Sequence, residues 1–150
     1  MKESPQSKKL DEMLRSSKLA AGGFMGHDSR SVYEIIDNDL AIVSELGYTK
    51  EQVAARMQEI TDKAIELLGD WKEIDEKLIT RVDEAKGSLV CPWPHSGRYA
   101  KRVTYVKSID TDQTIQWSDL NIHFIKEHGF FEGKGANFRI EPEELIKIIF

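Results

Sequence analysis

Two stretches of the chain have the apolar spacing of amphipathic helices, and they follow each other directly. In residues 29–46 the apolar positions recur every three or four residues, which places them on one face of a helix. Residues 49–68 repeat this pattern. Only Gly47–Thr49 connects the two patterns, so we expect a helical hairpin.

Polar residues and a glycine mark the expected ends of these helices. Asp28 or Ser29 is suited to cap the first helix. Thr49, with Gln52 three residues later, has the spacing of a capping box for the second helix. Gly69 stands where the second helix should end, because glycine adopts the left-handed conformation of a C-cap without strain.

After these helices the apolar spacing changes to the alternation of β-strands. Residues 78–83, 99–109 and 114–117 alternate apolar and polar side chains, and the polar segment 110–113 has the composition of a turn. The last two strands are therefore expected to form an antiparallel hairpin. In the first strand, the face shared by Leu78, Thr80 and Val82 is expected to be buried.

The C-terminal third predicts two further helices. Ser118 is expected to cap a helix that ends near His128, and Pro142 is expected to begin the final helix. Residues 138–140 have the composition of a short strand. The predicted fold is α+β: an N-terminal helical hairpin packed on a small antiparallel sheet, with two further helices. Residues 1–20 form a tail or short helix, and residues 21–150 a single domain.

Composition and charge narrow the functional classes. The chain has 40% hydrophobic and 31% charged residues, which is typical of a globular protein. Its net charge of −5 does not favour a general binder of nucleic acid or anionic membranes. The single cysteine cannot form an internal disulfide, and neither a secretory signal nor an apolar run of about 20 residues is present. We therefore expect a cytoplasmic protein without membrane contact.

The segment LGYTKEQVA at residues 46–54 resembles the turn and second-helix start of helix-turn-helix DNA-binding domains. The resemblance implies a regulatory protein whose second helix faces DNA. Residues 29–69, however, contain four basic and eight acidic residues, a net charge of −4. DNA binding depends on cations that neutralise phosphates, so this charge argues against DNA as the partner.

A cluster of bases accompanies two tyrosines in the second predicted strand, where residues 97–109 contain no acidic residue. The members of this cluster are Arg98, Lys101, Arg102 and Lys107, beside Tyr99 and Tyr105. Interleaved bases and aromatic rings can bind single-stranded nucleic acid. Exposed lysines on a strand also prevent sheet-to-sheet aggregation. Because the surrounding chain is acidic, a small anionic ligand or a protein partner is favoured over nucleic acid.

The segment CPWPHSG at residues 91–97 contains the only cysteine and two of the four prolines. Proline fits neither a helix interior nor a central strand, so this loop is expected to form a rigid corner between strands. The corner aims Trp93 and His95 in fixed directions, toward the core or toward a ligand. His128 falls on the apolar face of its helix and is expected to be a hydrogen-bonded core histidine.

Cysteine and histidine are zinc ligands, and Cys91, His95, His123 and His128 could form a zinc site. In an α-helix, residues five apart diverge by about 140°, so His123 and His128 are expected to point away from each other. An extended proline loop would place Cys91 and His95 on the order of 12 Å apart unless the Trp93–Pro94 bond were cis. The sequence therefore predicts no cofactor, and zinc is an alternative.

These observations predict a binding or accessory protein with a pocket or partner surface near residues 91–98 and 117–131. The ligand-binding candidates are Cys91, Trp93, His95, Arg98, His123 and His128. One alternative is a hydrolase or thiol-dependent enzyme that uses Cys91 with nearby histidines. A helix-turn-helix regulator is a further alternative. No residue is assigned a catalytic role.

Overall fold

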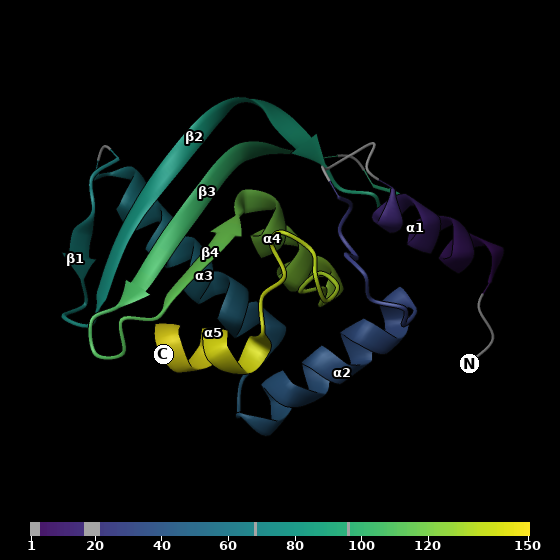
Figure 1. Ribbon diagram of the computed structural model, residues 1–150, viewed down its shortest axis with the longest axis horizontal. Coiled ribbons are helices and arrows are strands. Elements are labelled where there is room, and N and C mark those ends of the chain that lie inside the picture. The colour runs from purple at the N-terminus through teal and green to yellow at the C-terminus, as the bar shows by residue number, and fades with distance from the viewer. Residues whose placement is uncertain (1–3, 17–21, 68, 96) are drawn as a thin grey trace.

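A four-stranded antiparallel sheet with helices packed on one face forms the framework of the protein, and this confirms the predicted α+β class (Figure 1). The structure is a computed structural model that describes residues 4–16, 22–67, 69–95 and 97–150. The strands, in their order across the sheet, are β1 (Lys72–Ile74), β2 (Leu78–Val90), β3 (Arg98–Ser108) and β4 (Thr114–Ser118). The helices are α1 (Pro5–Arg15), α2 (Val32–Glu45), α3 (Lys50–Ile65), α4 (Asp119–His123), the π-helical segment η1 (Phe124–His128) and α5 (Pro142–Ile149).

The helical hairpin has the predicted elements, with one change at its start. Thr49 caps α3, and the capping box with Gln52 is complete. The cap of α2 is Ser31, in a capping box with Glu34, and neither Asp28 nor Ser29 has this role. Asp28 instead binds the guanidinium of Arg30 through both carboxylate oxygens, at 3.0 and 2.7 Å. The second helix was predicted to run to residue 68, which lies outside the described residues, and to end at Gly69; α3 ends earlier, at Ile65, with Glu66 as its C-cap.

Two further segments differ from the prediction. Residues 138–140 do not form a strand. There Arg139 reaches the buried carboxylate of Asp39 at 2.5 Å and the exposed carboxylate of Glu141 at 3.1 Å, so side-chain ion pairs hold this segment in place of a strand ladder. Strand β1, which is only three residues long, was not predicted because so short a segment carries no readable alternation.

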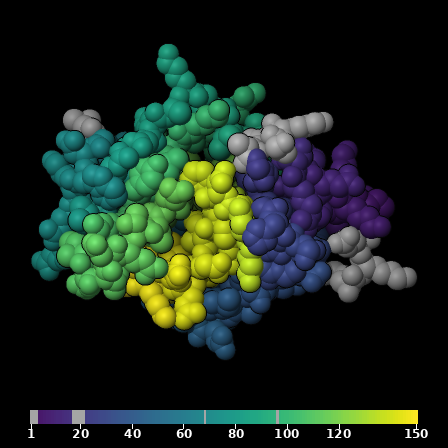
Figure 2. All heavy atoms as spheres, in the orientation of Figure 1, coloured from purple at the N-terminus to yellow at the C-terminus, as the bar shows by residue number. Residues whose placement is uncertain are grey.

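Two hydrophobic clusters stabilise the molecule. The first lies between the sheet, α3 and α5, and contains Leu78, Val106 and Trp117. The predicted buried face of β2 is confirmed, since Leu78, Thr80 and Val82 are buried. The second cluster joins α1, the start of α2, and η1 with the end of β2 and the residues that follow it. In the space-filling view, the C-terminal residues lie between the strands and α2 (Figure 2).

The distal parts of β2 and β3 form an arm that connects the two clusters. The register shifts between Glu84, which pairs with Arg102, and Ser88, which pairs with Ala100. Extra residues in one strand bend it and increase its twist. Accordingly, β2 and β3 arch over α4, and β2 ends and β3 begins near α1 (Figure 1). Among the described residues, no helix combines the length and apolar character needed to cross a membrane.

Candidate metal centre

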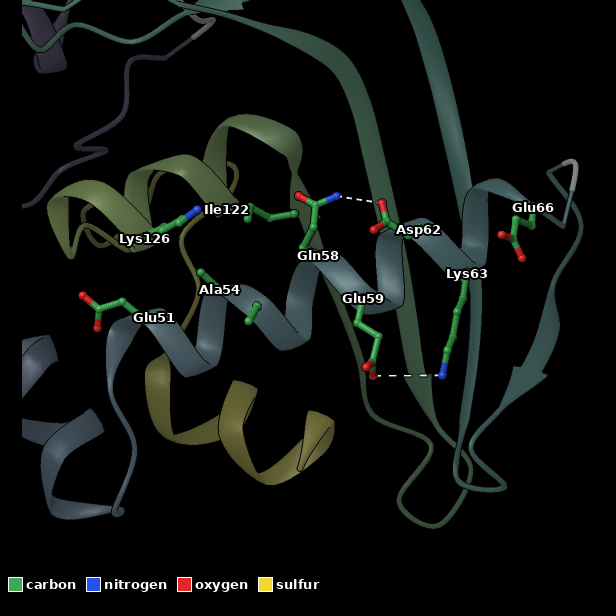
Figure 3. A pocket seen from close by; sticks show the side chains of 10 residues that line it. Glu51, Ala54, Gln58, Glu59, Asp62, Lys63, Glu66, Ile122 and Lys126 are labelled. Carbon is green, nitrogen blue, oxygen red and sulfur yellow. Dashed lines mark hydrogen bonds and ion pairs between the residues drawn. The ribbon is translucent and has the colours of Figure 1, made fainter.

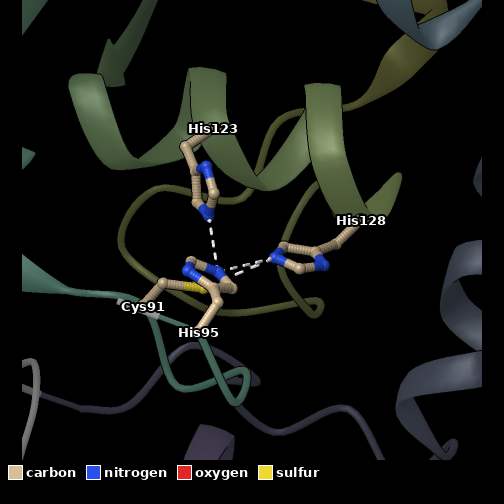
Figure 4. A group of neighbouring side chains, drawn as sticks. All are labelled: Cys91, His95, His123 and His128. Carbon is tan, nitrogen blue, oxygen red and sulfur yellow. Dashed lines mark hydrogen bonds between the residues drawn. The ribbon is translucent and has the colours of Figure 1, made fainter. Parts of the chain in front are cut away.

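Cys91, His95, His123 and His128 converge at the end of this arm, and we call them the Cys/His cluster (Figure 4). One ligand atom from each side chain lies within 4.8 Å of the corresponding atom of every other. Cys91 follows β2, His95 belongs to the loop before β3, and the two remaining histidines end α4 and η1. The expectation that these side chains lie apart is therefore wrong.

Three distances within the Cys/His cluster are close to the edges of a tetrahedral zinc site. The Nε2 atom of His95 lies 3.1 Å from Nε2 of His123 and 3.3 Å from Nε2 of His128. The Cys91 Sγ atom lies 3.5 Å from His128 Nε2. Zinc bonds of about 2.05 Å to nitrogen and 2.3 Å to sulfur give tetrahedral edges of about 3.4 Å for N···N and 3.6 Å for S···N.

The contacts of His95 show why hydrogen bonds alone do not account for this arrangement. A neutral imidazole nitrogen carries either one hydrogen or one lone pair in the ring plane. His95 Nε2 therefore cannot make good hydrogen bonds to both His123 Nε2 and His128 Nε2. A cation at the centre would accept a lone pair from each ring at once.

The π-helical segment η1 explains why His123 and His128 point to one site. An α-helix would separate residues five apart by about 140°. In a π-helical turn the hydrogen bonds run between residues five apart, which brings such residues over one another. Phe124 and Phe130 pack together at 5.3 Å across this segment, and Gly129 ends it at φ +66°. Apolar packing therefore stabilises a helix geometry that the sequence spacing does not reveal.

A tight turn explains why Cys91 and His95 meet. The backbone N–H of His95 donates to the carbonyl oxygen of Trp93 at 2.8 Å, which reverses the chain within three residues. Within the described residues no peptide bond is cis, so the turn forms with trans prolines. The assumption of an extended path through Pro92 and Pro94 was the error in the sequence-based distance.

Aromatic residues fix the orientation of two of the histidines. The Tyr99 hydroxyl lies 2.9 Å from His123 Nδ1, and its ring stacks on the His123 ring at 4.4 Å. Trp93 stacks on His128 with ring centroids 4.0 Å apart and planes 8° apart. Trp93 also contacts Phe124 edge-on. This predicted ligand-binding residue therefore lies between the core and the Cys/His cluster. Tyr99 was not a predicted site residue, since nothing in the spacing of β3 indicates its contact with α4.

Burial favours the neutral forms of Cys91, His123 and His128. It raises the pKa of the Cys91 thiol to about 11 and lowers the pKa of His128 to about 4. The pKa of His123 is also lowered, first by burial and then by the neighbouring His95. The imidazole lone pairs of His123 and His128 are thus available at neutral pH, whereas the thiol must lose a proton to become a metal ligand.

Comparisons with known proteins found no match. No protein-family model matches the chain, and no curated protein or solved structure is similar to it at a significant level.

The predicted candidate Arg98 lies outside the Cys/His cluster. It is exposed and donates from Nη1 to the Ser88 hydroxyl at 3.4 Å, across the arm. Two of the other bases of β3, Arg102 and Lys107, are paired with acidic groups. Arg102 binds Glu84 and Asp119, each at 2.7 Å, and Lys107 pairs with Asp112 at 2.9 Å. These pairs weaken the case for an anion site on β3.

A groove of about 480 Å³ lies elsewhere, between α3 and the α4–η1 segment (Figure 3). Its charged lining residues are Glu51, Glu59, Asp62, Lys63, Glu66 and Lys126. Gln58 donates to Asp62 at 2.8 Å, and Lys63 lies 4.0 Å from Glu59, so several of these groups are paired within the groove. The groove shares Ile122 and Lys126 with the predicted surface segment 117–131, and none of its lining residues belongs to residues 91–98.

Proposed function

We propose that this protein is a zinc-binding module in which the Cys/His cluster ligates one zinc ion. The convergence of one thiol and three imidazoles, whose ligand atoms lie within 4.8 Å of one another, is the observation that carries this proposal. Four side chains from two segments of the chain, residues 91–95 and 123–128, supply the ligands, and four protein ligands are typical of a structural zinc site.

The donor set favours zinc over other common metals. Magnesium and calcium prefer oxygen ligands, and the Cys/His cluster offers nitrogen and sulfur. Zinc binds both thiolate and imidazole and has no electronic preference for a non-tetrahedral geometry. Copper also binds thiolate and imidazole, so the identity of the metal is part of the test below.

The bound ion would attach the end of the β2–β3 arm to the helix formed by α4 and η1. This cross-link would fix the surface formed by residues 91–98 and 117–131, where we place the partner surface of a small binding or accessory protein. The arrangement requires a reduced cysteine, so we assign the protein to the cytoplasm, where thiols stay reduced.

A thiol-dependent enzyme is the alternative, because Cys91 Sγ lies 3.5 Å from His128 Nε2. Such a pair works as a nucleophile and base when the thiolate is stabilised. Here burial raises the pKa of the thiol to about 11 and lowers the pKa of the histidine to about 4. The proton therefore stays on sulfur, which favours a metal-ligand role. The helix-turn-helix alternative receives little support, because the groove side of α3 carries its three acidic residues, Glu51, Glu59 and Asp62.

Metal analysis of untagged protein tests this proposal. We expect one zinc per chain after exhaustive dialysis, and loss of that zinc in His128→Ala. The matched control is His27→Ala, which removes the one histidine outside the Cys/His cluster and should leave the zinc content unchanged. Absence of stoichiometric metal from the unaltered protein, both as purified and after incubation with zinc, would reject the proposal.

A further inference from the structure

The four members of the Cys/His cluster differ in how firmly the fold holds them. Cys91 is 4% exposed and belongs to the second hydrophobic cluster. His123 is half-buried between Tyr99, which contacts its Nδ1, and the start of η1. His128 is half-buried and stacks on Trp93. Three of the ligands are thus built into the end of a strand and a helix.

His95 differs from these three in position and exposure. It is solvent-exposed and lies in the loop between β2 and β3, with Pro94 before it. Its ring packs on the other ligands themselves, at 5.3 Å from the His128 ring and 4.8 Å from the His123 ring. Removing the His95 side chain would therefore leave the packing of Trp93 and Tyr99 on the remaining histidines intact.

We infer that His95 is the exchangeable ligand of the metal centre, and that its departure opens a coordination position to water or a small anion. This inference rests on the proposed metal binding and assigns a further property to the same site. In the exchange the bond from the metal to His95 Nε2 breaks, and a bond from the metal to an oxygen or nitrogen atom of the incoming ligand forms. No change in oxidation state is involved.

The charge at the site determines the class of the incoming ligand. A divalent ion with one thiolate carries a net charge of +1, and Lys50 and Lys126 act electrostatically on the histidines as further cations. Glu127 is the acidic group that acts on His123. The remaining donor set, one thiolate and two imidazoles with an open position, is of the kind found in catalytic zinc sites. Small anions and metal-bound hydroxide are therefore the expected occupants.

Cobalt(II) substitution with azide as the probe tests this inference, because the visible spectrum of cobalt reports its ligands. The full chain is compared with His95→Ala and with His123→Ala, which removes a ligand held by the helix. We expect His95→Ala to retain one cobalt ion and His123→Ala to lose it. If His95 occupies its position for more than 90% of the time, its removal should tighten azide binding about tenfold or more.

Two results would overturn the inference while leaving metal binding intact. One is loss of cobalt from His95→Ala as complete as from His123→Ala. The other is a His95→Ala protein that holds cobalt and shows no spectral response to azide. If the unaltered chain binds no cobalt, the proposed metal site itself fails. His128→Ala serves as the second helix variant if His123→Ala does not fold, with far-ultraviolet circular dichroism as the check of folding.

Discussion

Replacing Tyr99 by phenylalanine removes one oxygen atom next to the Cys/His cluster and leaves the stacked ring in place. The Tyr99 hydroxyl lies 2.9 Å from His123 Nδ1. When Nε2 of a neutral imidazole binds a metal, the proton resides on Nδ1, and here it would be donated to the tyrosine oxygen. The hydroxyl therefore fixes both the ring orientation and the tautomer that zinc requires.

The size of the expected effect follows from this hydrogen bond. Loss of a hydrogen-bond partner to a metal-ligating histidine lowers metal affinity by about 10- to 100-fold, or about 1.4–2.7 kcal/mol. Since zinc stabilises the fold through binding, the zinc-dependent part of the free energy of unfolding should decrease by the same amount. The metal-free variant should lose no more than about 1 kcal/mol, which is typical of one hydrogen bond.

Competition with a chelator measures the zinc affinity, and urea denaturation with and without zinc measures the stability. Tyr105→Phe is the matched control, because Tyr105 lies in the same strand and faces Arg81 on the other side of the sheet from α3. The control should bind zinc as the unaltered protein does. An affinity for zinc in Tyr99→Phe within about twofold of the unaltered protein would refute the role of this hydroxyl, since outer-shell contacts usually have larger effects.

Three further predictions concern protons and charge. Zinc binding at pH 8 should release about one proton per ion, because burial raises the pKa of the Cys91 thiol to about 11 while free imidazoles are already neutral. Calorimetry in buffers of different ionisation enthalpy measures this number, and Cys91→Ala should release none. Burial also raises the pKa of Glu132, which accepts from Asn121 at 2.5 Å, to about 8. The folded state then binds more protons than the unfolded state between about pH 4.5 and 8, so stability should fall by up to about 5 kcal/mol as pH rises through this window. Urea denaturation across this range should show a flatter profile for Glu132→Gln, and an equal slope in both proteins would contradict the assignment. Asp39→Ala should reduce the free energy of unfolding by about 3 kcal/mol, because the buried Arg139 loses the partner that lies 2.5 Å away. A loss below about 1 kcal/mol would show that the Asp39–Arg139 ion pair contributes little to stability.

Much of the fold follows from local patterns in the sequence. Regular spacing and capping residues predict α3 closely, because Thr49 and Gln52 satisfy the free backbone groups within the same segment. The start of α2 was misplaced because Asp28 has the right chemistry for a cap but is used in an ion pair with Arg30. The Asp28 carboxylate can either cap the helix or pair with a cation, and the sequence pattern does not show which of the two it does.

The sequence predicts which residues form the candidate site, but it does not predict how they are arranged in space. The sequence identified the four members of the Cys/His cluster, and the ideal α-helix and the extended proline path then separated them. Both assumptions failed for local reasons: η1 is π-helical, and a tight turn joins Trp93 to His95. The arched arm is a third requirement, since the register shift after Glu84 directs the end of β2 toward α4. The contact between Tyr99 and His123 also depends on this arrangement, so the sequence alone did not predict it.

X-ray absorption at the zinc edge, on untagged protein loaded with one equivalent of zinc, tests the central claim most directly. The account predicts a single zinc with one sulfur ligand at about 2.3 Å and three nitrogen ligands at about 2.0–2.1 Å. The sulfur contribution should disappear in Cys91→Ser. A zinc ion with no sulfur ligand, or one whose spectrum is the same in Cys91→Ser, would contradict the assignment of the Cys/His cluster as the metal site.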